Sequence, residues 1–179
     1  MKWIFLLCLV ATGAFADDCP AVTDHSQRMS EIITELGLAE DEAEARVLNQ
    51  ELWSLWTDAP DARAQTMLDE GMARRSNYDF LGAREVLGRL IDYCPDYAEG
   101  YNQRAFASFL GQDFAAALED LERTLEITPN HVAALSGKAL TLMGLGRNEE
   151  AQEVLRAAVE MNPWLQERAL LITPIGTDL

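Results

Sequence analysis

Apolar residues recur at three- and four-residue spacing in the middle of the chain. The stretch AEGYNQRAFASFL at residues 98–110 and the stretch FAAALEDLERTLEI at residues 114–127 both show this spacing, which is typical of helices with one buried face. Residues 111–113 interrupt the pattern, and Pro129 ends the second stretch because proline cannot continue a helix. The pattern predicts two antiparallel helices joined by a short turn.

The same pattern returns every 34 residues, a period marked by Pro95, Pro129 and Pro163. The three units occupy residues 64–97, 98–131 and 132–165. Small residues recur at position eight (Gly71, Ala105 and Ala139) and at position twenty (Ala83, Ala117 and Ala151). Leucine recurs at position twenty-four (Leu87, Leu121 and Leu155). Because helices that cross closely need small residues at the crossing, each unit is predicted to be a tightly packed helix pair.

This repeat resembles the tetratricopeptide repeat, a 34-residue helix–turn–helix unit. The resemblance covers residues 64–165 and implies an all-α fold, a right-handed superhelical solenoid of such repeats with flanking helices. The chain departs from the family pattern at position eleven, with Arg74 and Ser108, and at position seventeen, with Asn148. The turn of the second unit also looks shifted by one residue, because its glycine is Gly111.

Helical patterns flank the repeats on both sides. Residues 24–63 contain two helical stretches separated near residues 39–41, and we expect a divergent hairpin stacked on the first unit. The stretch WLQERALLI at residues 164–172 is expected to be the capping helix that the last unit of a solenoid requires. Residues 173–179 are expected to be a short tail.

The amino-terminal end has the pattern of a secretory signal peptide. Residues 1–16 combine Lys2, an apolar run and a small-residue cleavage site at residues 14–16. The apolar run of about 14 residues is shorter than the roughly 20 that span a bilayer, which disfavours a membrane anchor. We therefore expect an exported bacterial protein, secreted across the inner membrane into the periplasm, with a tail at residues 17–23 and no membrane insertion after cleavage.

Two cysteines, Cys19 and Cys94, follow the predicted signal peptide. An exported protein enters a compartment where disulfides persist, and neither cysteine has the His or Cys neighbours of a metal site or a reactive thiol. Two arrangements stay open, one intramolecular disulfide or two free buried thiols. The disulfide is favoured because it would tie the amino-terminal tail, which has little apolar surface of its own, to the folded body.

The charge of the chain disfavours two classes of partner. The chain has 14 Lys and Arg residues against 30 Asp and Glu residues, a formal net charge of −16. Phosphate backbones and anionic lipid headgroups repel such a surface. Nucleic acid and anionic membranes are therefore not expected partners.

The sequence shows no recognisable catalytic motif. It has no HExxH, GxSxG or paired CxxC motif, and no phosphate-binding glycine loop. His25 falls in the tail and His131 in an inter-repeat turn, where we expect it to be solvated. We therefore expect no enzyme, no cofactor and no metal.

The resemblance to tetratricopeptide repeats also implies a binding surface. In these repeats the first helix of each unit lines a concave groove, chiefly through positions two, five, six, nine, twelve and thirteen. The candidate binding residues by this pattern are Leu68, Met72, Arg75, Asn102, Gln103, Phe106, Phe109, Leu140 and Met143. Because aromatic and methionine side chains are enriched at interfaces, we expect a protein or peptide partner.

Two functions remain open for this groove. The protein is either a non-catalytic adaptor that binds a protein or peptide there, or a structural subunit of a cell-envelope complex whose groove is filled by its own amino-terminal helices. The family also has a clamp for the terminal carboxylate of chaperones. That clamp is not expected, because its Lys, Arg and Asn positions hold Leu68, Met72, Gln103, Ala133 and Gly137.

Overall fold

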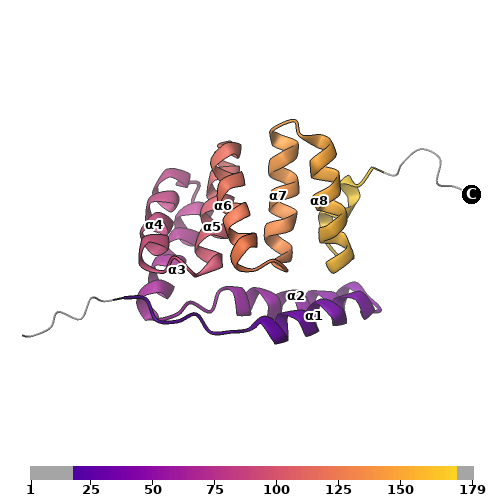
Figure 1. The fold of residues 1–179 in the computed structure, drawn as a ribbon, viewed down its shortest axis with the longest axis horizontal. Coiled ribbons are helices and arrows are strands. Elements are labelled where there is room, and N and C mark those ends of the chain that lie inside the picture. Colours follow the sequence, from indigo (N-terminus) through magenta and orange to yellow (C-terminus); the bar gives the residue numbers. More distant parts are fainter. Residues whose placement is uncertain (1–17, 173–179) are drawn as a thin grey trace, which may run out of the picture.

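The computed structural model describes residues 18–172, so the predicted signal peptide and the tail at residues 173–179 lie outside the described residues. Within that range the chain forms α-helices and one short 3-10 helix, with no strand. The elements are α1 (Ser26–Leu38), α2 (Glu42–Trp56), α3 (Ala62–Ser76), α4 (Phe80–Tyr93), α5 (Ala98–Leu110), α6 (Phe114–Ile127), α7 (Val132–Gly144), α8 (Asn148–Met161) and η1 (Gln166–Leu170). The three predicted helix pairs stand side by side as an array (Figure 1).

The turn inside each unit is built the same way three times. The fifteenth residue of each unit has a positive φ, 63° at Tyr78, 61° at Gln112 and 75° at Gly146. The next residue donates its N–H to a carbonyl five positions earlier, as from Asp113 N to Ser108 O at 2.9 Å. This is a helix-ending pattern that needs one left-handed residue. The turn of the second unit is therefore not shifted, although its glycine precedes the left-handed position.

Aspartates begin the second helix of the first two units. The carboxylates of Asp79 and Asp113 accept hydrogen bonds from backbone N–H groups of the first turn, which satisfies donors that have no partner inside the helix. The third unit has Arg147 at the same position and no side-chain cap. Local sequence thus fixes where the helices of each pair start and stop.

The predicted close crossings inside the units are confirmed. A Cβ atom added at Gly71 would lie 2.5 Å from Cγ of Leu87, so only a glycine fits there without movement. Ala83, Ala117 and Ala151, at position twenty, are all completely buried. The small residues let the two helices of a pair approach closely, as the spacing indicated.

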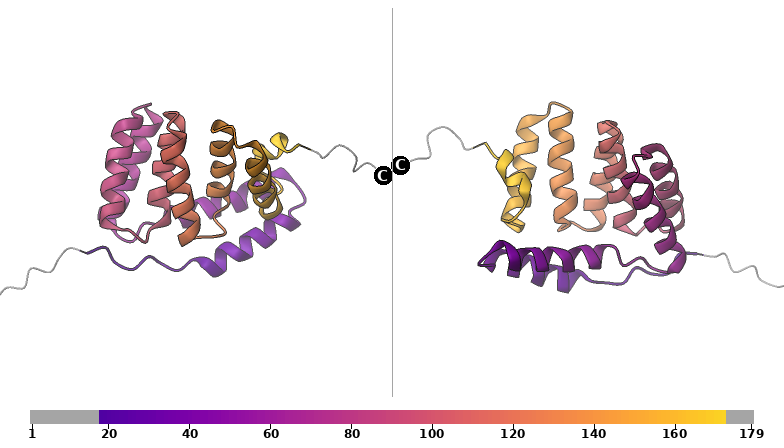
Figure 2. Two further views of the ribbon diagram at one scale, coloured as in Figure 1. Left: turned by 45° about the horizontal axis from the view of Figure 1, so that its top comes forward. Right: turned by 180° about the vertical axis from the view of Figure 1, so that it is seen from behind.

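The amino-terminal hairpin of α1 and α2 does not stack on the first unit, so that expectation is wrong. It lies crosswise along the end of the array that carries the turns between units (Figures 1 and 2). Hydrogen bonds join it to the closing segment of each unit: Tyr97 Oη to Trp56 O at 2.8 Å, Asn130 Nδ2 to Ser30 Oγ at 3.4 Å, and two in the third unit, Asn162 Nδ2 to Asn49 Oδ1 at 2.8 Å and Trp164 Nε1 to Leu36 O at 3.1 Å. The hairpin therefore braces all three units at once.

The hairpin has a small apolar core of its own, made of Ile32, Leu36, Ala45, Leu48 and Leu52. Trp164, which follows α8 at the end of the third unit, packs against this core, and α1 also contacts α8. Burial of apolar surface explains where the hairpin lies. Its apolar core is covered by residues such as Trp164 rather than by α3.

The carboxyl-terminal cap is shorter than the helix predicted over residues 164–172. Trp164 packs against the hairpin, and within residues 18–172 only η1 follows it. The side chain of Gln152 in α8 holds the segment after η1, since its Nε2 donates to Leu170 O at 3.0 Å and its Oε1 accepts from Ile172 N at 2.7 Å. The side-chain amide of Gln152 thus holds this segment by hydrogen bonds where the sequence predicts a packed helix.

The structure pairs Cys19 with Cys94, with their Cα atoms 5.2 Å apart. Cys94 is buried in the core of the first unit, and Cys19 packs against that core. The pairing attaches the amino-terminal segment beside the first inter-repeat turn. The oxidised state of the two thiols in the isolated protein stays a prediction.

Candidate functional site

A cavity of about 260 Å³ lies in the groove between α5 and α7. Its lining residues are Trp53, Asn102, Gln103, Ala105, Phe106, Phe109, Leu121, Ala133, Ser136, Gly137, Leu140, Thr141, Leu165 and Glu167. Trp53 belongs to the hairpin, and Leu165 and Glu167 follow α8, so segments outside the helices of the array complete the cavity. Their contribution has no counterpart in the repeat pattern, so the repeat positions do not predict these three residues.

Five of the nine predicted binding residues line this cavity: Asn102, Gln103, Phe106, Phe109 and Leu140. Phe106 is 45% exposed, whereas Phe109 is half-buried with its ring centroid 5.5 Å from that of Phe114. Met143 is half-buried and lies outside the lining. Phe106 is therefore the accessible ring of the groove, and Phe109 supports its wall.

The predicted residues of the first unit do not line the cavity. Leu68 is completely buried in a cluster with Leu87 of the paired helix α4, so the expectation that it forms an accessible groove contact is wrong. Met72 packs against the same core. The guanidinium of Arg75 lies 4.3 Å from the centre of the Phe106 ring and covers one side of it. The first unit thus contacts the groove through Arg75 but does not line the cavity.

A buried polar network lies beneath the groove. The carboxylate of Glu99 is 1% exposed and accepts hydrogen bonds from Asn102 Nδ2 at 3.1 Å and from Gln103 Nε2. Arg75 Nη1 donates to Gln103 Oε1. Burial lowers the pKa of Arg75, while the negative charge of Glu99 acts in the opposite direction. The amide nitrogens of Asn102 and Gln103 are thus engaged inside the protein.

His131 is buried, so the expectation of a solvated turn residue is wrong. Its ring stacks on Trp56 of the hairpin, with centroids 4.2 Å apart, and its Nε2 lies 2.9 Å from a carboxylate oxygen of Glu99. Its Nδ1 accepts the N–H of Ala134 at 3.2 Å. Because Nδ1 accepts, Nε2 carries the proton of the neutral ring and donates to Glu99. His131 therefore connects the hairpin to the network under the groove.

Known proteins with a similar sequence belong to one repeat family. The tetratricopeptide repeat family model matches residues 109–164. A TPR repeat-containing protein of Rhizobium etli is 28% identical over 132 residues, which cover 72% of this chain and 63% of that protein. A tetratricopeptide repeat protein 36 homologue of Nematostella vectensis is 38% identical over 72 residues, which cover 40% of each chain. The chain thus spans less than two thirds of the length of these relatives.

Solved structures agree with this family. The TPR2B domain of yeast Sti1, in its pHsp70 complex, superposes with a TM-score of 0.55 at 28% identity, covering 56% of this chain and 81% of that one. The array is a tetratricopeptide-repeat solenoid. The first TPR domain of Spaghetti (RPAP3), bound to the HSP90 peptide SRMEEVD, gives a TM-score of 0.59 over 62% of this chain and 88% of that one. At 21% identity this second likeness bears on the fold alone.

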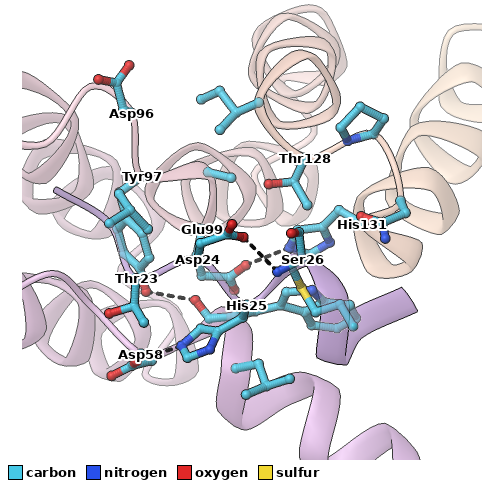
Figure 3. A pocket seen from close by; sticks show the side chains of 18 residues that line it. Thr23, Asp24, His25, Ser26, Asp58, Asp96, Tyr97, Glu99, Thr128 and His131 are labelled. Carbon is cyan, nitrogen blue, oxygen red and sulfur yellow. Dashed lines mark hydrogen bonds and ion pairs between the residues drawn. The ribbon is translucent and has the colours of Figure 1, made fainter. Parts of the chain in front are cut away.

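A second cavity, of about 300 Å³, lies where the amino-terminal segment crosses the turns of the tetratricopeptide-repeat array. Figure 3 shows lining residues of the amino-terminal segment, Thr23, Asp24, His25 and Ser26, together with Asp96, Tyr97, Thr128 and His131 from the array. His25 Nε2 lies 2.8 Å from Asp58 Oδ2. Burial, together with the charges of Glu99 and Asp58, raises the pKa of Tyr97. This cavity lies at the interface between the hairpin and the array.

Metal sites and membrane spans are two further kinds of feature that the described residues could carry. Among residues 18–172, no group of three or more His, Cys, Asp or Glu side chains is placed to hold a metal ion. In the same range no helix has both the length and the apolar character that crossing a bilayer requires. What the tetratricopeptide-repeat array offers is a shaped surface.

Proposed function

We propose that the protein is a non-catalytic adaptor that binds a protein or peptide segment in the concave groove of its repeat array. The observation that carries the proposal is the cavity between α5 and α7, with the half-exposed ring of Phe106 in its wall. An accessible aromatic ring in a concave, mostly apolar site is typical of interface hot spots.

A similar domain that has been solved as a complex supports the proposal. The domain of yeast Sti1 is described in a complex with pHsp70. The clamp positions of the present chain hold no Lys, Arg or Asn, so a terminal chaperone carboxylate is not the proposed ligand. The alternative structural subunit, with its groove filled by the amino-terminal helices, has less support because the hairpin contributes only Trp53 to the lining among the described residues.

The test is photo-crosslinking from the groove. A photoreactive phenylalanine analogue at position 106 should form adducts with a partner in the native compartment, and the same analogue at the exposed Leu81 should not. Phe106→Ala should then weaken the identified complex by about 2 kcal/mol. Leu81→Ala is the control, since Leu81 lies on α4, is 73% exposed and does not line the cavity.

The test changes Phe106 alone and leaves Phe109 in place. The ring of Phe109 is half-buried against Phe114, so its removal would also leave a cavity inside the protein. Adducts from position 81 but not from position 106 would move the binding surface out of the groove and overturn the proposal.

We further propose that the adaptor acts after export, in the periplasm of a two-membraned bacterium. The signal-peptide pattern of residues 1–16 and the pairing of Cys19 with Cys94 support this location, because disulfides persist outside the cytosol. Cell fractionation and amino-terminal sequencing test it. A mature chain that begins at Asp17 in the periplasmic fraction is expected, and an uncleaved cytosolic chain would contradict the proposal.

A further inference from the structure

The groove cavity is apolar on most sides. Phe106, Phe109 and Leu140 provide large apolar surface, and Ala105 and Gly137 keep part of the lining flat. Its volume of about 260 Å³ is below the roughly 300–1,000 Å³ of typical small-molecule pockets. The space suits one or two side chains of a polypeptide.

Two residues of α7 that line the same cavity each have a buried side-chain hydroxyl without a hydrogen-bond partner in the protein. Ser136 is 5% exposed and Thr141 is completely buried, and neither side-chain oxygen has a partner in the protein. Of the described residues, only four have such a side-chain atom, and the other two are Trp56 and Ser108. A buried, unpaired hydroxyl is costly, and because neither oxygen is accessible, its side chain must rotate toward the cavity to donate to an acceptor of a ligand.

The two contributions from outside the repeats differ in chemistry. Trp53 is 41% exposed and lies one helical turn before Trp56, which is fixed by its stacking on His131. The hairpin therefore holds the indole of Trp53 at the cavity. Glu167 is the only charged residue of the lining, and among the described residues no ion pair involves it. The cavity thus combines apolar surface, hydroxyl donors and one carboxylate.

We infer that this cavity is a subsite for an apolar side chain of a partner polypeptide that has a Lys or Arg residue next to it. The apolar side chain lies among Trp53, Phe106 and Leu140. On binding, the side chain of Ser136 or Thr141 rotates and donates to a backbone carbonyl of the partner, and the basic group lies at Glu167. A net charge of −16 favours the approach of such a basic segment. The inference rests on the proposed function and narrows it to one ligand chemistry.

The test uses defined peptides and nuclear magnetic resonance of the full chain labelled at its tryptophan indoles. The probe is an acetylated, amidated hexapeptide of Gly and Ser with a central Arg–Phe pair, and the comparison peptides carry Glu–Phe or Arg–Ser. The Arg–Phe peptide should shift the Trp53 indole signal saturably, with the signal assigned by Trp53→Phe. The Glu–Phe peptide should bind about threefold more weakly, and this preference should vanish in Glu167→Gln. The Arg–Ser peptide should give no shift.

Hydroxyl variants test the hydrogen-bonding part separately. Ser136→Ala combined with Thr141→Val should weaken binding of the Arg–Phe peptide about fivefold, the effect of losing one hydrogen bond. Ser108→Ala is the matched control, because Ser108 also has a buried, unpaired hydroxyl but does not line this cavity. Equal affinity in the double variant and the wild type would overturn the donor role of the two hydroxyls.

The remaining outcomes separate the inference from the proposed function. If position 106 crosslinks a partner but the Arg–Phe peptide shifts no groove signal, the adaptor role stands and the inferred ligand chemistry is wrong. If the Arg–Phe and Glu–Phe peptides bind equally, the basic neighbour is wrong. If position 106 gives no adduct and no peptide binds, the groove is not the binding surface and both proposals fall.

Discussion

The repeat array has two ends, and the chain builds them by different means. At one end the turns inside the units are copies, each with one left-handed residue and the same backbone hydrogen bond. At the other end the turns between units carry different side chains, among them Tyr97, His131 and Trp164, and each meets the hairpin in its own way. The first end is fixed by local contacts, the second by contacts 41 to 128 residues apart.

This difference changes how the solenoid holds together. In a plain repeat array each unit contacts only its neighbours, and stability is approximately a sum of neighbouring terms. Here the hairpin contacts the turn after every unit, so it links the first unit to the last. We call the end that the hairpin contacts the braced end, and the end with the turns inside the units the copied end. Substitutions at the braced end should therefore change the free energy of unfolding most, and substitutions at the copied end least.

The largest expected effect comes from opening the pair of Cys19 and Cys94, which attaches the chain beside the braced end. In the chain-entropy model, a disulfide with a sequence separation of 75 contributes roughly 4 kcal/mol to the free energy of unfolding. The variant with both cysteines replaced by serine should lose about that amount in chemical denaturation. Thiol labelling of the denatured, unreduced mature protein should find no free thiol, and two labelled cysteines would contradict the pairing.

The next effect tests the centre of the brace. His131→Ala removes the ring that stacks on Trp56, donates to Glu99 and caps α7. Because the Glu99 carboxylate would stay buried with one donor fewer, we expect a loss of about 3 kcal/mol in the free energy of unfolding.

The control for this change is His25→Ala, which removes the more exposed pair of His25 and Asp58 and should cost less than about 1 kcal/mol. Denaturation curves of the two variants compare them directly. Similar losses would mean that the buried contact of His131 is no more important than a surface pair.

The sequence predicts the copied end well and the braced end poorly, for a physical reason. Period, small residues and prolines fix the helix pairs, because these features act within one unit. Among the residues that contact the hairpin, Tyr97, His131 and Trp164 share no residue type, so they leave no periodic signal. The apolar pattern of residues 24–63 predicts two helices but not the direction in which they dock.

The groove shows the same division. Phe106, Phe109 and Leu140 follow from the repeat positions, whereas Trp53 and Glu167 reach the cavity from segments outside the repeat. Leu68 fails for the opposite reason, since its position in the first unit is used for packing against α4. A family pattern therefore predicts which face a helix presents, but not which other segments of the chain cover or complete that face.

The third substitution lies inside the array, between its two ends. Ala117 is completely buried at a close crossing, so Ala117→Leu should overpack it at a cost on the order of 1–3 kcal/mol. If the hairpin couples the units, the protein should still unfold in one transition, with helix loss and tryptophan fluorescence changing together. Separate transitions for the two probes would show that the brace does not couple them, and an unchanged melting temperature would contradict the crossing.

The smallest effect is expected at the copied end, and it should be a gain. Gln112 holds a left-handed conformation with φ of 61° at the position where the third unit has Gly146 with φ of 75°. A residue with a side chain is disfavoured there, so Gln112→Gly should stabilise the protein by about 1 kcal/mol. Gly146→Ala is the reciprocal control and should lose a similar amount, because a Cβ at Gly146 would meet no atom within 4 Å and only the backbone conformation is tested. Thermal melts measure both, and a loss of stability in Gln112→Gly would mean that the three turns are not equivalent.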